Sequence, residues 1–563
     1  MRNSTVSLWM VMLLLGVYLA GCKGDSQQKA AEPETEEVGS EPAVTLTSEE
    51  MARAKQIYFN LCAGCHGATR RGATGPSLLP DGDGKFPATK ELGTEALTHI
   101  IMNGLPGGMP DWGKQGVLTE EEAKLMAKYL QLPPPPIPQM TMEDVRKSWK
   151  VYVPVEARPT RPETQRNWKN YMGVILRDAG KVAIIDGDTK EPVAVLNTGF
   201  AVHILRSSSS GRYFYSIGRD GKVTLIDLWP EKPQIVAEVK TAFDARSVEV
   251  SKYKGPQGDF RDKYIIAGGY VPSHFVVCDA MTLEPLKMVS TKGKVLDTGE
   301  YLEEARVASI VASHHDPLWV VNVKETGMVW LVDYSDLDNI EQNITKIPTA
   351  RFLHDGGWDH SGKYFLVAAN AENKIVVIDV PNKKLEKIIE VGTKPHPGRG
   401  TNIQHPKYGH LWLTGHIGEG LVAAIATDPG PHQWEVVENV RMPGVGGGTL
   451  FIKSHPKSKH VWVDRPLNTN EDLQRTIYVY DAATMELKKT LRVPDRYKAR
   501  AVHLEYNKNG DEVWVSGWAK KDDESVLLVF DDKTLELKKE ITGDWLVTPT
   551  GKFNVYNTAH DIY

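Results

Sequence analysis

This chain has few cysteines, no excess of basic charge and no long apolar run, and each of these features excludes a class of protein. Four cysteines in 563 residues are too few for a disulfide framework. A formal net charge of −5 lacks the basic excess that nucleic-acid binding requires, so no nucleic-acid partner is expected. The apolar run from Leu8 to Leu19 is too short for a comfortable membrane span. The length permits two or three domains with substantial cores.

The N-terminal stretch has the order of an export signal. Arg2 precedes the apolar run, and the small residues Ala20 and Gly21 stand before Cys22. This order resembles bacterial lipoprotein signals. We therefore expect a signal peptide at 1–21 and an acylated Cys22, with Lys23 favouring an outer-membrane anchor on the periplasmic side. The alternatives are an uncleaved anchor and an ordinary signal with a coincidental cysteine. Residues 22–46 contain almost no large apolar side chains and predict a flexible tether.

Two capping boxes mark the start of helices in residues 47–132. Thr47 with Glu50 opens a helix that runs towards Cys62. Thr119 with Glu122 opens another, whose apolar face consists of Ala123, Met126, Ala127 and Leu130. This helix stops at a stiff polyproline run, residues 133–136. The pattern predicts a small all-α domain at 47–132 and a Pro-rich linker at 133–150.

From residue 151 onward the apolar spacing changes from helical to β, and a unit repeats. Eight runs of β-branched and apolar residues end in Asp, at 182–186, 223–227, 275–279, 328–333, 375–379, 421–428, 477–481 and 526–531. They recur about every 49 residues, the length of a four-stranded blade, so residues 151–563 predict an all-β eight-bladed propeller. A row of β-sandwich domains is the alternative, but the steady period favours closure. Cys278, inside one run, is expected to be a buried and inert thiol.

The helical domain contains Cys62-Ala63-Gly64-Cys65-His66, the attachment motif for c-type haem. Two thiols at this spacing reach the two vinyl groups of one porphyrin, and the adjacent histidine coordinates the iron. A redox dithiol beside an idle histidine is the alternative, but an export signal agrees with haem attachment outside the cytoplasm. As second axial ligand we expect Met109, because Gly107 and Gly108 leave its loop flexible and a thioether raises the potential. Met102 is the competitor, although its stretch is typical of a buried helix face.

Three of the 17 histidines stand in unusual surroundings. His203 follows Gly199-Phe200-Ala201-Val202. His354 and His396 lie among glycine and proline, in tight loops that can aim a side chain at a ligand. Without further information, each of these histidines is better explained as a surface or core residue than as a functional residue.

These loops carry a resemblance to a known family. The helical domain and the propeller together are similar to cytochrome cd1 nitrite reductase, a periplasmic denitrification enzyme with haem c and haem d1. The similarity extends from about residue 48 to the C-terminus, and it is dense at 176–180, 218–222, the His354 and His396 segments, and 548–556. Unusual loop sequences shared in several blades are more specific than a shared fold.

The resemblance implies roles for particular side chains. His203 would be the proximal ligand of the haem d1 iron, and His354 with His396 would form a pair above the open coordination position. Haem d1 bears several carboxylates, which suit arginine. The residues that match the family's contacts to the macrocycle are Arg177, Arg219, Arg246, Tyr270, Arg399, Thr548 and Gly551. A surface salt bridge is the alternative for any single arginine.

Two positions depart from familiar members of the family. No tyrosine lies between Cys22 and Thr47, so the tyrosine that some members place on the resting haem d1 iron is expected to be missing. His503 stands where familiar members carry Gln, so hydrogen bonding on the distal side or the rim is expected to differ.

The implied reaction reduces nitrite to nitric oxide and water with one electron and two protons. Two histidines suit the proton delivery because imidazolium titrates near working pH, and their charge attracts the anion. The electron is expected from a small c-type cytochrome or a cupredoxin, through haem c to haem d1. The resemblance also suggests a homodimer.

Two other functions are compatible with this domain order. A related haem d1 biosynthesis dehydrogenase would share the attachment motif and the propeller but need not keep both distal histidines. A non-enzymatic electron-transfer propeller would need neither them nor His203. The presence of His354, His396 and the C-terminal segment favours the reductase.

Overall fold

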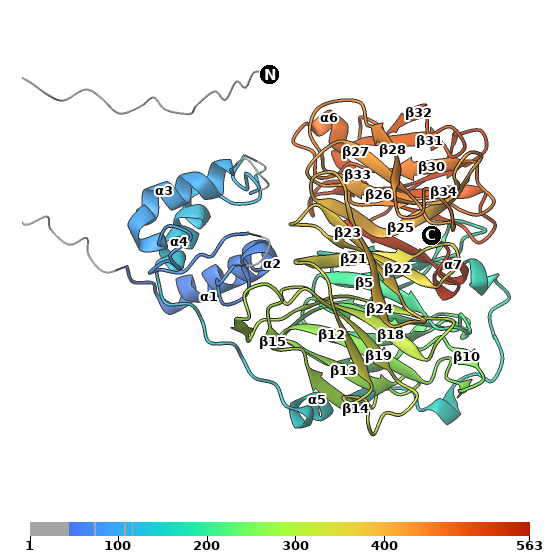
Figure 1. Cartoon of the computed structure of the whole chain (residues 1–563), viewed down its shortest axis with the longest axis horizontal. Helices are drawn as coiled ribbons and strands as arrows, with labels where there is room; N and C mark the ends of the chain where they lie inside the picture. Colours follow the sequence, from blue (N-terminus) through green and yellow to red (C-terminus); the bar gives the residue numbers. More distant parts are fainter. Residues whose placement is uncertain (1–43, 73–74, 106–108, 115) are drawn as a thin grey trace, which may run out of the picture. The chain divides into compact units, whose positions relative to one another are not determined.

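The computed structural model describes residues 44–72, 75–105, 109–114 and 116–563. The predicted signal peptide, Cys22 and most of the tether lie outside the described residues, as do Gly107 and Gly108. Among the residues described, no helix is both long enough and apolar enough to cross a membrane. Leu46–Tyr563 form one unit, which begins with helices and continues as sheet (Figure 1).

The helical domain is built from α1 (Ser48–Ile57), α2 (Ala63–His66), α3 (Thr89–Asn103) and α4 (Glu120–Leu130), with a π-helical turn at Tyr58–Cys62. Both expected capping boxes are present, because the Thr47 and Thr119 side chains accept from the third backbone N–H of their helices. The predicted apolar face of α4 is buried against α1 and α3 in a single core. The all-α prediction for this domain is confirmed.

The stretch expected to be a linker contains a further helix, α5 (Met142–Ser148), with its own capping box at Thr141 and Asp144. Val145 is fully buried in a core of the β domain, and Trp149 packs beside it. Strand β1 (Lys150–Val151) then pairs with β8. The apolar side chains of this short segment therefore tie it to the sheet, which its proline content did not indicate.

The β domain is an eight-bladed propeller, as predicted. From inner to outer strand, the first four blades are β37 (Pro549–Asn554), β2 (Met172–Leu176), β3 (Lys181–Ile185) and β4 (Pro192–Asn197); β5 (Val202–Ser207), β6 (Tyr213–Gly218), β7 (Lys222–Asp227) and β8 (Gln234–Lys240); β9 (Asp244–Val250), β12 (Tyr264–Val271), β13 (His274–Asp279) and β14 (Pro285–Ser290); and β17 (Val307–Ala312), β18 (Leu318–Val323), β19 (Met328–Asp333) and β20 (Ile344–Pro348).

The other four blades are β21 (Leu353–Trp358), β22 (Tyr364–Ala369), β23 (Lys374–Asp379) and β24 (Lys384–Glu390); β25 (Pro395–His405), β26 (Gly409–His416), β27 (Leu421–Ala426) and β28 (Val436–Arg441); β29 (Ile452–Lys453), β30 (His460–Val463), β31 (Thr476–Asp481) and β32 (Leu487–Arg492); and β33 (Ala499–Tyr506), β34 (Glu512–Ala519), β35 (Val526–Asp531) and β36 (Leu537–Ile541). The loops within and between the blades contain β10 (Lys254–Gly255), β11 (Gly258–Asp259), β15 (Gly293–Lys294), β16 (Tyr301–Leu302) and α6 (Glu471–Gln474), and α7 (Val555–Ala559) follows the last strand.

The inner strands close the propeller into a ring. Each of β37, β5, β9, β17, β21, β25, β29 and β33 contacts the next, and β33 contacts β37. The last strand of the chain, β37, pairs with β2, with Gly173 opposite Phe553. The C-terminal segment thus completes the first blade, which leaves no open inner edge.

Each of the eight Asp-ended runs is the third strand of a blade, which explains the repeat. In seven of the runs the aspartate closes the turn that follows; for example, Asp279 Oδ1 accepts from the backbone N–H of Met281 and Thr282 at 2.9 and 2.8 Å. A short polar acceptor is needed there because the turn leaves these donors without a backbone partner. Asp428 instead accepts from the His410 N–H at 2.9 Å.

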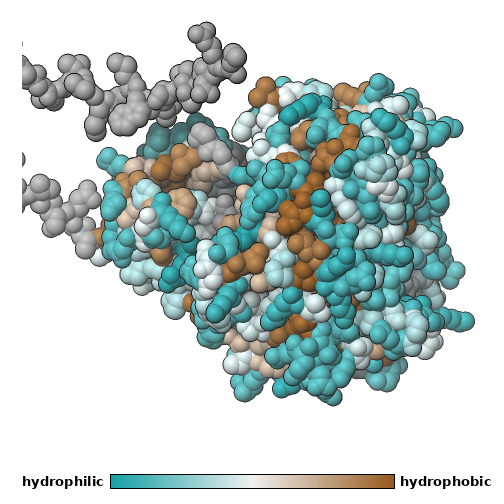
Figure 2. All heavy atoms as spheres, viewed as in Figure 1, coloured by the Kyte–Doolittle hydropathy of each residue, from teal (hydrophilic) through white to brown (hydrophobic). Residues whose placement is uncertain are grey.

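Between the blades the facing sheets form apolar cores. In four blades a tryptophan of the second strand is fully buried (Trp319, Trp412, Trp462 and Trp514). Cys278 is fully buried in β13, as expected, and burial raises the pKa of its thiol. Figure 2 shows hydrophilic residues over most of the visible face, with hydrophobic residues gathered in a band across the propeller.

Candidate active site and cofactor sites

The attachment motif ends the π-helical turn and forms α2, so its two cysteines and its histidine lie on consecutive turns of one helical segment. His66 is buried, and its Nδ1 lies 2.8 Å from the carbonyl oxygen of Pro76. This bond fixes the tautomer and leaves Nε2 as the coordinating atom, while burial lowers the pKa of His66 and favours the neutral ring. A side chain at Gly75 would stand 2.9 Å from the His66 ring. The residues present fit a covalently held haem.

Of the two methionines considered as second axial ligand, Met102 packs against the helical core, as its apolar stretch suggested. Met109 is half-buried, and its carbonyl accepts from the backbone N–H of Leu105 at 3.2 Å. This placement leaves the Met109 thioether outside the core and keeps Met109 as the proposed ligand.

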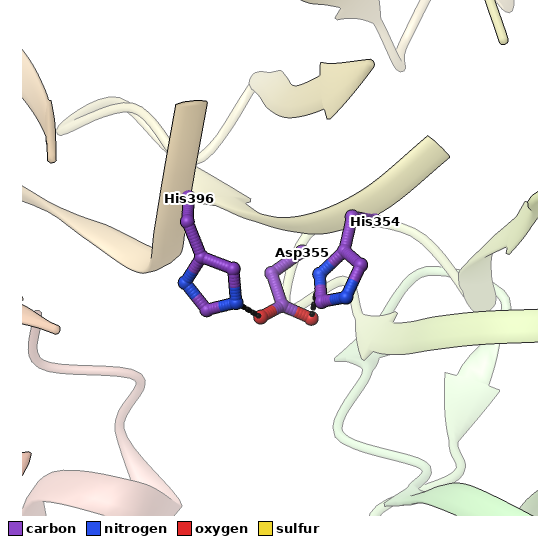
Figure 3. A group of neighbouring side chains, drawn as sticks. All are labelled: His354, Asp355 and His396. Atoms are coloured by element: carbon purple, nitrogen blue, oxygen red, sulfur yellow. Dashed lines mark ion pairs between the residues drawn. The ribbon is translucent and has the colours of Figure 1, made fainter. Parts of the chain in front are cut away.

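Two of the three unusual histidines meet at neighbouring inner strands. His354 of β21 and His396 of β25 have ring centroids 4.9 Å apart. Asp355 lies between them, 3.3 Å from His354 Nδ1 and 3.5 Å from His396 Nε2 (Figure 3). His396 Nδ1 is 2.9 Å from the carbonyl oxygen of Leu450. The predicted pair therefore forms one group, joined by a carboxylate for which the sequence had indicated no role.

The third histidine, His203 of β5, presents an exposed side chain on an inner strand. Protein packed around the accessible ring displaces part of its hydration and lowers its pKa, the positive charge of Arg246 lowers it further, and Asp355 opposes the shift. Arg177 and Arg219 lower it further. These side chains from separate blades share one electrostatic environment. A neutral, accessible imidazole among cations fits a metal ligand that faces an anionic cofactor.

Two of the arginines assigned to the macrocycle keep donors that nothing in the described chain satisfies. Arg246 Nε and Arg399 Nη1 are buried without a hydrogen-bond partner among the described residues. Arg246 lies over the Tyr270 ring at 5.2 Å, and Arg399 Nη2 is held 3.1 Å from Glu249. Buried donors without partners are costly, and these two fit a ligand with acceptor oxygens. Arg177 is half-buried and pairs with Asp178 at 2.7 Å.

Arg219 has different partners. Its guanidinium makes a bidentate pair with Asp244, at 3.1 and 2.6 Å, and donates to the carbonyl of Phe59 at 2.6 Å. In this position Arg219 links the propeller to the segment that leads into the haem c motif.

Sequence reasoning missed two further residues that hold this segment. Arg306, fully buried and paired with Glu325, donates to the carbonyls of Ala63 and Gly64 at 3.3 and 3.1 Å. Glu304 accepts from the backbone N–H of Ala68 at 2.6 Å. Neither residue stands in a recognisable motif, so only the tertiary contacts find them.

The two C-terminal residues singled out by the resemblance lie in or next to strand β37. Thr548 is buried, and its hydroxyl accepts from the Asp178 N–H at 2.9 Å, next to Arg177. Gly551 lies in β37, where a side chain would approach the Phe553 ring to 2.9 Å. His503 is buried between Phe451 and Phe553, with centroid distances of 4.5 and 5.4 Å. It lies one ring away from His396, which also contacts Phe451.

An α-helical haem c domain joined to a propeller with a histidine and arginine centre defines a class of two-haem redox protein. Comparison with known proteins gives the family. Residues 166–558 match the cytochrome D1 heme domain, and residues 49–130 match the cytochrome c oxidase, cbb3-type, subunit III family. The chain belongs to the cytochrome cd1 nitrite reductase family, an oxidoreductase family with haem c and haem d1, and the resemblance read from the sequence is confirmed.

Individual relatives agree with this assignment. The chain is 48% identical over 549 residues to a nitrite reductase of Stutzerimonas stutzeri, covering 93% of this chain and 96% of the relative. It is 27% identical over 508 residues to the dihydro-heme d1 dehydrogenase of Pseudomonas aeruginosa, covering 90% and 94%. The solved structure of dihydro-heme d1 dehydrogenase NirN in complex with DHE has a TM-score of 0.67 and 26% identity, covering 90% of this chain and 100% of that one.

Proposed function

We propose that this protein reduces nitrite to nitric oxide and water on the propeller, with electrons that enter through the helical domain. The observation that carries the proposal is the group of His354, Asp355 and His396, in which two imidazoles converge on one carboxylate beside His203. The overall change consumes one electron and two protons for each nitrite. Two histidines supply one proton each, which matches the stoichiometry.

Two separate sets of residues would hold haem c and haem d1. Cys62 and Cys65 would form the thioether bonds, with His66 and Met109 as axial ligands. His203 would ligate the second iron, while Arg177, Arg246, Tyr270 and Arg399 would face the macrocycle, and Arg219 would stand at its edge and hold the helical domain. When bound, haem c relays one electron and haem d1 supplies the iron at which nitrite accepts it.

The charges around His354 and His396 determine how this distal pair would respond to the nitrite anion. Burial lowers the pKa of His354 to about 4, Asp355 opposes this shift, and the charge of Lys324 adds to it. An approaching nitrite brings a second negative charge, which favours protonation of the imidazoles. His354 and His396 would then each deliver a proton to the departing oxygen as general acids.

The route of the electron into the propeller would pass through the segment at 59–69. Carbonyls of this segment accept from Arg219 and Arg306, while Glu304 accepts from its N–H groups. These contacts would keep the attachment helix at a constant distance from the inner strands. The external donor would be a small c-type cytochrome or a cupredoxin.

Localisation and assembly follow from the N-terminal region and from family resemblance. We expect the mature chain in the periplasm, attached to the outer membrane through an acylated Cys22, and we expect a homodimer. Metabolic labelling with a radioactive fatty acid, compared between wild type and Cys22→Ala, tests the attachment. Light scattering of the detergent-solubilised protein tests the dimer.

The function is tested by pigment extraction and turnover on the purified holoenzyme. Acidified solvent should release a green haem d1, and reduced protein should convert nitrite to nitric oxide at an electrode. A pigment with the spectrum of a haem d1 precursor, and no nitric oxide, would instead support the biosynthetic dehydrogenase. If the extract contained no pigment, so that the propeller carried no haem of its own, the remaining interpretation would be a non-enzymatic electron-transfer protein.

A further inference from the structure

Asp355 lies at the centre of the distal group but is not one of the expected proton donors. The residue follows His354 directly in β21, and its two carboxylate oxygens point in different directions (Figure 3). Oδ1 is 3.3 Å from His354 Nδ1, and Oδ2 is 3.5 Å from His396 Nε2. One carboxylate therefore contacts both imidazoles at once.

The hydrogen bonds around His396 decide which of its nitrogen atoms faces Asp355. His396 Nδ1 lies 2.9 Å from the carbonyl oxygen of Leu450, and a carbonyl can only accept, so Nδ1 carries a proton. Nε2, on the side of Asp355, is then the atom that gains and loses the second proton. When Nε2 is protonated, the ring is cationic and lies against the carboxylate.

The charges that face Asp355 are mostly positive when the imidazoles are protonated. His354, His396 and His203 all act to lower the pKa of Asp355, against the effect of burial, and on balance it is lowered. Lys324 lies close enough to His354 for its charge to disfavour an imidazolium there. Arg246, Arg177 and Arg219 bear on the same centre through His203. Asp355 is the carboxylate whose negative charge offsets this excess of positive charge at His354.

We propose that Asp355 is the positioning residue of the distal pair: a permanently ionised carboxylate that holds His354 and His396 in place and favours their protonation when nitrite binds. The inference rests on the proposed function, because it assigns a role within that site. Asp355 itself transfers no proton. In each turnover one N–H proton leaves His354 and one leaves His396, both join the departing oxygen to form water, and each neutral ring regains a proton from solvent.

This role predicts the direction of a pH shift. If turnover requires both imidazolium groups in the nitrite complex, activity is lost as the pH rises and these groups lose their protons. An opposite charge within about 4–6 Å raises the pKa of a base by about 1–3 units. In Asp355→Asn, which has nearly the same shape, the midpoint of this loss should therefore move to lower pH by about 1–3 units.

A matched control lies at the other end of the same strand. His360 follows β21, about 20 Å along the strand from His354 at about 3.3 Å per residue. There Asp428 lies 3.0 Å from His410 Nδ1 and 3.6 Å from His360 Nε2, so the group has the same composition. Asp428→Asn should leave the midpoint unchanged, and Asp355→Glu, which keeps the charge, should restore most of the wild-type profile.

The experiment measures two quantities on each holoenzyme from pH 5 to 9. One is nitric oxide formation under single-turnover conditions, and the other is the dissociation constant of nitrite for the oxidised protein, followed by absorbance. Both midpoints should move together in Asp355→Asn, whereas a purely structural defect lowers activity at every pH without moving them. If Asp355→Asn does not retain haem d1, Asp355→Ser provides the same comparison.

The outcomes separate the two proposals. Midpoints identical to wild type in an Asp355→Asn protein that retains both haems would overturn the role of Asp355. A wild-type holoenzyme that binds nitrite but forms no nitric oxide would overturn the proposed function itself. A shift in Asp428→Asn as large as that in Asp355→Asn would show a general charge effect and would also overturn the assignment.

Discussion

Replacement of His396 by alanine tests the proposed chemistry directly. The ring is buried, is held by the Leu450 carbonyl at 2.9 Å and faces Asp355 at 3.5 Å, so the variant removes a single well-positioned proton donor. It also leaves Asp355 with one imidazole fewer beside an anionic substrate. Both effects slow the reaction and neither concerns an expected iron ligand.

The magnitude follows from what one general acid contributes. Such a group accelerates a reaction by about 10² to 10⁴-fold. At 1.36 kcal/mol for each factor of ten, this is about 2.7–5.4 kcal/mol of transition-state stabilisation. We expect nitrite turnover to fall by about two orders of magnitude or more in His396→Ala, and equally in His354→Ala. Both haems should be retained in full.

The assay compares these variants by stopped flow, with nitric oxide release and the oxidation of pre-reduced haem c recorded separately. Electron transfer from haem c should change much less than nitric oxide release. The double variant should lose less than the product of the single losses, because both histidines act on one departing oxygen. His410→Ala, which removes a histidine from the group around Asp428, serves as the control. Near-normal nitrite activity in each single variant would refute the two-histidine mechanism. It would favour the alternative hypothesis that the protein is a haem d1 biosynthesis dehydrogenase.

Four further predictions concern the cofactors, the backbone and the pH dependence of folding. Cys65→Ser should abolish the normal covalent haem and turnover with a cytochrome or cupredoxin donor, while the propeller still binds haem d1; turnover surviving with the natural donor would contradict the proposed electron path. His203→Ala should remove or misligate haem d1 and leave the haem c spectrum intact, which extraction and absorbance can check. In Gly357→Ala the new Cβ would overlap the Arg399 carbonyl oxygen, so the His396 segment must shift, and turnover should fall at unchanged haem c content. Because the folded-state pKa of His354 is about 4, below the ordinary 6.5, the unfolded chain takes up its proton first as the pH falls. Without haem d1, this histidine should therefore cost about 3 kcal/mol of stability between pH 6.5 and pH 4, and thermal unfolding of His354→Gln should lack that loss.

Local chemistry determined much of this protein from its sequence alone. The spacing of Cys62, Cys65 and His66 specifies a haem c site, since the three side chains are neighbours on one helical segment. The capping boxes at Thr47 and Thr119 are formed within three residues, and aspartates such as Asp279 at the ends of third strands close their own turns. Such signals are readable because the partners are close in the chain.

Tertiary structure alone decided which distant side chains meet. In the sequence, nothing distinguishes Asp355 from an ordinary polar residue. Its role becomes visible only in the fold, where β21 and β25 are neighbours and place His396 beside it. Arg219, which resemblance assigned to the macrocycle, also contacts Asp244 and Phe59, and Arg306 and Glu304 stand in no motif. These contacts join residues up to 243 positions apart, and their geometry follows from the closure of eight blades rather than from any local pattern.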